Sequence, residues 1–144
     1  MKIEEISKQF AVHLGVESYL LDQLVIDARR HGMMVFELDL SALSNVAELC
    51  QYLETEFKYP YRTAGLDAAI DLISDLEWFG NTRGYLIVVR GASDSSNVSG
   101  VFASLLPPIL DVWRKQGIPF VVALEEKGLI AFEGVTGVGA SVAG

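Results

Sequence analysis

A chain of 144 residues with 51% hydrophobic residues can bury one substantial core, so we expect a single folded domain. Charges interrupt its apolar stretches every few positions, and none approaches the roughly 18 to 20 residues that cross a bilayer, so we expect no membrane-spanning helix. The formal net charge of −8 repels phosphate backbones, which disfavours direct nucleic-acid binding and favours a basic partner.

Two features of the sequence favour a reducing, cytoplasmic compartment. The first ten residues, MKIEEISKQF, carry two glutamates where a secretion signal has a basic segment and an uninterrupted apolar run. Cys50 is the single cysteine, so no internal disulfide can form. It falls on the apolar side of a predicted helix, which indicates a small buried side chain rather than a reactive thiol.

Residues 1–32 have the periodicity of two helices. Apolar residues at helical spacing form one stripe that ends at Gly15 and a second stripe between Leu20 and Ala28. We therefore predict a helical N-terminal extension over residues 1–33 that packs on the rest of the domain.

A strand and a helix are predicted next. Residues 33–40 alternate and are rich in side chains that fit a pleated surface, which predicts a strand. A helix begins after Asn45, because Asn45 and Glu48 have the spacing of an N-cap pair. Pro60 and its neighbours end this part of the chain, since proline cannot continue a helix and biases the preceding residue to extended geometry.

The segment from residue 66 to residue 78 predicts a helix with an apolar side and an acidic side. Asp67, Asp71 and Asp75 are four residues apart, so they lie along one face, and Trp78 falls on the same side. Like charges at this spacing repel at a cost of roughly a few tenths of a kcal/mol per pair, and no basic residue follows at a compensating position. The acidic side therefore predicts binding of an external cation, with Trp78 either anchoring that interface or folding under a neighbouring loop.

The second half of the chain predicts two more strands. Residues 85–89 form a continuous apolar run typical of a strand covered on both faces, and residues 118–124 form another. Between them, Pro107 and Pro108 predict two short helices that meet at an angle. The alternation predicts an α/β fold, a small three-stranded parallel sheet flanked by helices. Residues 126–144 predict a glycine-rich tail.

With this order of elements, the sequence resembles the barstar family of intracellular ribonuclease inhibitors. The resemblance covers residues 34–125 and rests on the segments VFELDLSAL, FKYPYRTAGLDAAIDLISDL, YLIVV and DVWRKQGIPFVVALE. Its most specific part is LDAAID, residues 66–71, close to the family pattern of leucine, aspartate, alanine, leucine, variable residue and aspartate. The resemblance implies a small α/β protein that inserts an acidic loop and helix into the active site of a basic ribonuclease.

The resemblance also implies roles for particular residues. Asp67 and Asp71 meet basic residues of the enzyme, with Asp71 as the central anchor, and Ile70 makes the bulky contact between them. Tyr61 is the aromatic residue of the binding loop and Leu76 ends the patch. With two residues added from the helix geometry, the predicted partner-binding set is Tyr61, Asp67, Ile70, Asp71, Asp75, Leu76 and Trp78.

The sequence departs from the family pattern at several positions. Thr63 and Gly65 stand where the family usually has glycine and asparagine before the helix, and Ile70 replaces the aromatic residue of the best-known inhibitor. A second acid expected on the last helix falls at Val112, with Asp111 one position away. We expect the fold to survive these changes, while the target stays open.

Two other functions remain open from the sequence. The acidic side could bind a non-nuclease partner as a plain interaction module, or serve only solubility. Alternatively, Asp67 and Asp71 could hold Mg²⁺ while the loop at residues 93–97 receives a phosphate, as in an enzyme. Against an enzyme, the sequence has no recognisable nucleophile or phosphate-loop motif. The main prediction is therefore a cytoplasmic inhibitor that is not an enzyme and needs neither cofactor nor metal.

Overall fold

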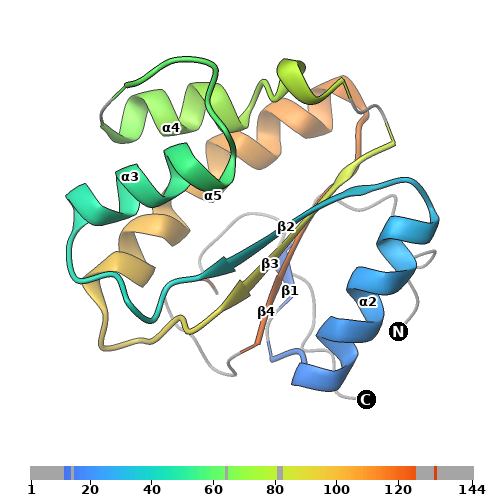
Figure 1. Ribbon diagram of the computed structural model, residues 1–144, viewed down its shortest axis with the longest axis horizontal. Helices are drawn as coiled ribbons and strands as arrows, with labels where there is room; N and C mark the ends of the chain where they lie inside the picture. The colour runs from blue at the N-terminus through green and yellow to red at the C-terminus, as the bar shows by residue number, and fades with distance from the viewer. Residues whose placement is uncertain (1–11, 14, 64, 81–82, 126–131, 133–144) are drawn as a thin grey trace.

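The protein, described by a computed structural model over residues 12–13, 15–63, 65–80, 83–125 and 132, has an α/β architecture (Figure 1). Within these residues one parallel sheet has the strand order β1-β4-β3-β2. Its strands are β1 (Val12–His13), β2 (Met34–Asp39), β3 (Tyr85–Arg90) and β4 (Phe120–Leu124). The helices are α2 (Ser18–Arg30), α3 (Val46–Glu56), α4 (Leu66–Ile73), the short 3-10 helix η1 (Glu77–Phe79) and α5 (Asn97–Gln116).

The predicted three-stranded parallel sheet is confirmed in β2, β3 and β4. The register pairs Met34 with Tyr85 at one end and Asp39 with Arg90 at the other, and β4 continues it on the far side of β3. β3 is the central strand, and residues 85–89 are at most 1% exposed. The continuous apolar run follows from this position, since both faces of β3 are covered.

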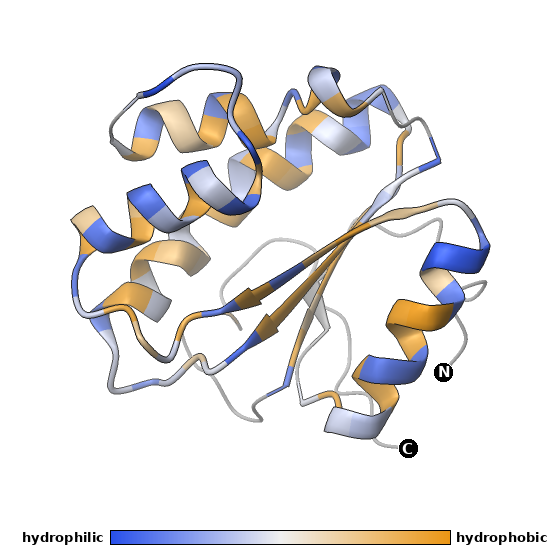
Figure 2. Cartoon of the chain, viewed as in Figure 1, coloured by the Kyte–Doolittle hydropathy of each residue, from blue (hydrophilic) through white to orange (hydrophobic). Residues whose placement is uncertain are grey.

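Helices cover both faces of the sheet, and apolar residues gather where they meet it (Figure 2). On one face, α3, α4 and α5 enclose a core to which β3 contributes Tyr85, Ile87 and Val89. On the other face, α2 packs on a second, smaller core that includes Leu86 and Val88. Because successive strand residues point to opposite faces, one strand supplies both cores.

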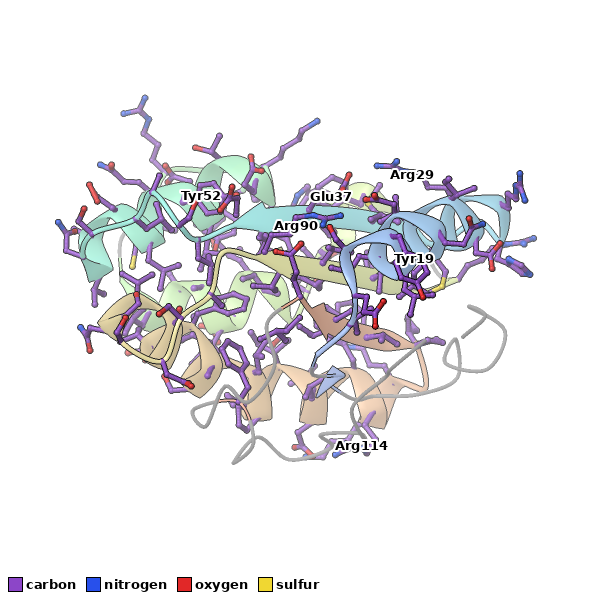
Figure 3. The ribbon with its side chains drawn as sticks, turned by 90° about the horizontal axis from the view of Figure 1, so that it is seen from below. Tyr19, Arg29, Glu37, Tyr52, Arg90 and Arg114 are labelled. Carbon is purple, nitrogen blue, oxygen red and sulfur yellow. The ribbon has the colours of Figure 1, made fainter. Side chains whose placement is uncertain are left out.

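The α2 helix confirms one of the two N-terminal helices predicted from the sequence. Its docking is reinforced by Arg90 at the end of β3, whose guanidinium contacts the Asp22 carboxylate at 2.7 Å, and by an Arg29–Glu37 pair at 3.5 Å (Figure 3). Ion pairs as well as apolar contacts therefore hold α2 on this face of the sheet.

The prediction of a helix running to Gly15 is wrong at Val12 and His13, which form β1. These two residues pair in parallel with Val122 and Ala123 of β4. The edge of β4 carries backbone groups that need hydrogen-bond partners, and β1 supplies them. Residues 1–11, where the rest of that helix was predicted, lie outside the described residues.

The prediction of two short helices at Pro107 and Pro108 is also wrong, because α5 continues through both prolines. Each proline removes one helical hydrogen bond, at a cost of about 3 kcal/mol. Buried side chains on both sides of the prolines offset this cost at about 1.5–3 kcal/mol each. These side chains include Phe102, Leu105, Leu106, Ile109, Leu110 and Trp113.

The predicted glycine-rich tail, residues 126–144, lies outside the described residues except at one position. Phe132 is fully buried in the larger core, with its ring centroid 6.3 Å from that of Phe102. None of the described helices is long and apolar enough to cross a bilayer.

Candidate protein-binding site

The predicted N-cap pair at the start of α3 is confirmed. The Glu48 backbone N–H donates to the Asn45 side chain at 2.9 Å, and the Ser44 N–H donates to the Glu48 carboxylate at 2.7 Å. At the other end of α3, Lys58 adopts a left-handed backbone with φ of 49°, which turns the chain into the loop at residues 58–65. We call this segment the binding loop.

The binding loop is held to α3 at one point and buries a phenol at another. The Thr63 N–H donates to the Glu54 carboxylate at 2.9 Å. The Tyr59 hydroxyl is buried and has no hydrogen-bond partner among the described residues, and burial raises the pKa of this hydroxyl far above its ordinary value. Tyr61, in contrast, is 61% exposed. The loop therefore presents Tyr61 to solvent from an anchored backbone.

The α4 helix is fixed to the core by its apolar side. Gly65 stands at its N-cap with φ of 100°, a conformation that side chains other than hydrogen rarely allow. Ala69, Leu72 and Ile73 are buried, and the Trp113 indole N–H donates to the Ile73 carbonyl at 3.0 Å. Because α4 is held at this end by α5, its opposite side has a defined orientation toward solvent.

Asp67 and Asp71 are exposed on that solvent side. One helical turn of four residues separates them by about 6 Å along the axis. Asp75 is also exposed, but it follows the end of α4 at Ile73 and lies in a turn. Among the described residues, no ion pair within 4 Å involves any of these three carboxylates.

Leu76 and Trp78, two residues of the predicted partner-binding set, are both more buried than the acids of α4. Leu76 is fully buried, with a left-handed φ of 49°, and it presents no side-chain surface to a partner in this conformation. Trp78 lies in η1, half-buried, and its indole N–H donates to the Phe57 carbonyl at 3.0 Å. The helical spacing placed Trp78 on the acidic side, and it failed there because α4 ends at Ile73, before Trp78.

Trp78 instead supports the binding loop. Its ring packs edge-on against Tyr59, with the centroids 6.5 Å apart. Of the two predicted roles, folding under a neighbouring loop is the one that the structure shows. Ile70 is half-buried against the larger core, so part of its side chain remains accessible.

The structure also shows the position of Val112, which stands where the family pattern has an acid on the last helix. Val112 is half-buried in α5, and the neighbouring Asp111 is exposed but pairs with Lys115 at 3.0 Å, four residues along the same helix. Asp111 thus has a cation of its own, unlike the acids of α4.

Two hollows adjoin this region and were not predicted from the sequence. A groove of about 720 Å³ separates α3 from the binding loop, with Cys50, Glu54 and Arg62 in its lining. A cavity of about 300 Å³ opens beside Asp75, and Glu77 stands on its rim. Glu77 was missed because an unbroken helix would turn it away from Asp75. No group of three or more potential metal ligands is found within the described residues.

Solved structures resemble this fold at low sequence identity. The ORC2 protein of Aeropyrum pernix, in ADPNP–ADP complexes, matches 97% of this chain with a TM-score of 0.60 and 14% identity, and the chain spans 43% of that protein. A chain of Drosophila ORC bound to DNA matches 96% of this chain, with 82% of its own length covered, a TM-score of 0.57 and 11% identity. Likeness at this identity shows the fold alone.

The sequence itself gives a family. It matches no curated protein at a significant level. Residues 33–125, which include β2, the binding loop, α4, β3, α5 and β4, match the family described as barstar (barnase inhibitor). This match covers more than half of the chain, and the protein therefore belongs to the barstar family.

Proposed function

We propose that this protein binds a basic ribonuclease in the cytoplasm and occludes its active site, without catalysing a reaction of its own. The observation that carries the proposal is the exposed pair Asp67 and Asp71, unpaired within the described chain and displayed on a helix fixed to the core. Membership of an inhibitor family supports a ribonuclease as the general class of partner.

The mechanism is imitation of substrate charge. A ribonuclease active site presents basic groups that hold a phosphodiester and stabilise its transition state. Carboxylates one helical turn apart can meet such groups in place of phosphates. Because α4 is already ordered, little conformational entropy is lost on binding. The net charge of −8 also speeds encounter with a basic protein at low salt.

The remaining residues of the proposed interface have separate roles. Asp71 is the central anchor, Asp67 is the second carboxylate, and Ile70 supplies apolar contact between them. Tyr61 offers an exposed ring from the binding loop. Asp75 extends the negative field past the end of α4.

Inhibition of RNA cleavage tests the proposal. The purified protein is mixed with candidate small bacterial ribonucleases, and cleavage is followed over time. Asp71→Ala should lose at least about 2 kcal/mol of affinity, the level that defines a hot spot. Asp111→Ala is the matched control, since that exposed carboxylate is already paired with Lys115. Equal inhibition by Asp71→Ala and wild type would show that the site is wrong.

A non-nuclease partner is the second candidate. Ile70 and Thr63 depart from the family pattern at the centre and edge of the proposed interface, which favours a changed target on a kept fold. Capture of partners from the source cell, using wild type and Asp71→Ala as baits, separates the two functions. A basic protein with nuclease activity supports the first, and a protein without it supports the second.

A further inference from the structure

We infer that the cavity at the end of the acidic row is a subsite for an arginine side chain of the partner protein. This inference rests on the proposed function and names a contact that the family pattern does not contain. The cavity has a volume of about 300 Å³ and lies between the turn after α4 and the end of α5. The argument uses Asp75, Glu77, Tyr85, Trp113 and Ile118 from its lining.

The rim of the cavity is acidic. Asp75 and Glu77 are both exposed, and the buried Leu76 between them has a left-handed backbone. In the part of the chain that the structure describes, neither carboxylate forms an ion pair with a basic side chain. A cation from outside the chain therefore meets two uncompensated charges at this rim.

Two buried aromatic residues, Tyr85 and Trp113, contribute to the lining of the cavity. Tyr85 and Trp113 are each 1% exposed, and Trp113 stacks on Phe120 with an interplanar angle of 7°. The Trp113 indole N–H is already bound to the Ile73 carbonyl, so the ring cannot turn without breaking that bond. Ile118 adds a half-buried aliphatic wall.

An arginine side chain matches both parts of the cavity. Its three methylene groups can lie against the apolar wall while the charged end stays at the rim. The planar guanidinium can donate to two carboxylates at once. A phosphate is repelled by the same rim, and an apolar side chain leaves both charges without a partner.

The electrostatics of the cavity agree with this assignment. Burial raises the pKa of the Tyr85 hydroxyl, and the charge of Asp75 raises that pKa further. The Asp75 carboxylate therefore acts on the interior of the cavity and not only on the outer surface. A guanidinium held there gains from the same field.

Titration with a single amino-acid derivative tests the subsite without a ribonuclease. The probe is N-acetyl-L-arginine methylamide, followed by two-dimensional NMR of the backbone amides and both indole N–H groups. We expect a dissociation constant on the order of millimolar, typical for one side chain. The shifts should centre on residues 75–80 and the Trp113 indole. The uncharged citrulline analogue, which has the same shape, should bind at least about 10-fold more weakly.

Two variants locate the binding. Asp75→Asn with Glu77→Gln should lose the arginine shifts, and Asp111→Asn should keep them. Both variants change exposed side chains, and their amide spectra show directly whether the fold is kept. Equal shifts with citrulline, unchanged shifts in the double variant, or shifts confined to Asp67 and Asp71 would overturn the inference.

The same double variant separates this inference from the proposed function. If no ribonuclease is inhibited but the arginine derivative binds as expected, the proposed function fails and the cavity keeps its cation preference. If a ribonuclease is inhibited, the double variant should raise the dissociation constant at least about 10-fold, the change that corresponds to 1.4 kcal/mol. Inhibition by the double variant equal to wild type would rule out the cavity as a partner subsite.

Discussion

Within the described residues, acidic side chains have ion-pair partners in one region of this protein and lack them in another. Where α2 meets the ends of β3 and β4, Arg90 contacts Asp22 at 2.7 Å and Glu125 at 3.0 Å. The Ser18 hydroxyl donates to the same Glu125 carboxylate at 3.0 Å. On α4, Asp67 and Asp71 stand one turn apart with no such cation among the described residues.

This difference shows that the composition of the chain does not force acidic side chains to remain unpaired. The chain carries basic residues and uses one of them for two acids where α2 docks. In that region, charge holds the protein's own elements together. On α4 the repulsion is small, roughly a few tenths of a kcal/mol per pair, so folding tolerates it and the charge remains available to a partner.

The largest effect should come from removing the apolar contact beneath the paired region. Leu24 of α2 is 1% exposed, so Leu24→Ala leaves a cavity and should lower the free energy of unfolding by about 2–5 kcal/mol. Ile26→Ala on the same helix is the control, because Ile26 is 45% exposed and should cost below about 0.5 kcal/mol. Urea denaturation measures both, and equal small losses would mean that α2 adds little to the domain.

Removing the shared cation should have the next largest effect. Arg90→Met leaves Asp22 and Glu125 without their common partner and should cost roughly 1–2 kcal/mol, since each partly exposed ion pair contributes up to about 1 kcal/mol. The control is Arg62→Met, an exposed position in the binding loop, with an expected change within about 0.5 kcal/mol. A loss no larger than that of the control would show that the paired region is held by apolar packing alone.

Neutralising the unpaired region should change stability in the opposite direction. Asp71→Asn removes the like-charge repulsion and leaves Asp67 in the first turn of α4, where the helix dipole favours a carboxylate, so it should raise the free energy of unfolding by roughly a few tenths of a kcal/mol. The gain should shrink with added salt, because salt screens exposed charges. Thermal unfolding at low and high ionic strength checks this, and a clear loss of stability would show that this carboxylate has a structural role.

The smallest effect concerns Asp39, whose carboxylate accepts hydrogen bonds from neutral donors. The Ser41 hydroxyl and N–H donate to the Asp39 carboxylate at 2.6 and 2.9 Å, and the hydroxyl is the first cause that lowers the Asp39 pKa from its ordinary 3.8. A lowered folded-state pKa stabilises the fold above the unfolded pKa, and this stabilisation is lost as pH falls through the folded value.

Ser41→Ala should therefore raise the pKa of Asp39 toward its ordinary value and weaken the acid dependence of stability. Carbon-13 NMR titration of the carboxyl group measures this pKa directly. Ser44→Ala is a control nearby, because Ser44 gives only its backbone N–H, to Glu48. An unchanged Asp39 pKa in Ser41→Ala would assign the lowering to the backbone N–H.

The sequence predictions failed where contacts between residues distant in the sequence decide the structure. The helix-breaking effect of the two prolines in α5 is outweighed by apolar burial along the whole helix. Sequence spacing does not reveal this burial. Val12 and His13 form a strand because the edge of β4 lies beside them, more than a hundred residues away in sequence. Trp78 leaves the acidic side because α4 ends at Ile73, where the Trp113 indole N–H binds the last carbonyl of the helix.

The sequence by itself determined the three main strands, the start of α3 and the spacing of Asp67 and Asp71. Each of these features depends on residues that are close together in the sequence. Only the tertiary structure decided which acids have cations, since Arg90 reaches Asp22 from 68 residues away. It also decided that Asp75 and Glu77 share the rim of one cavity, because that cavity exists only where α5 and the turn after α4 come together.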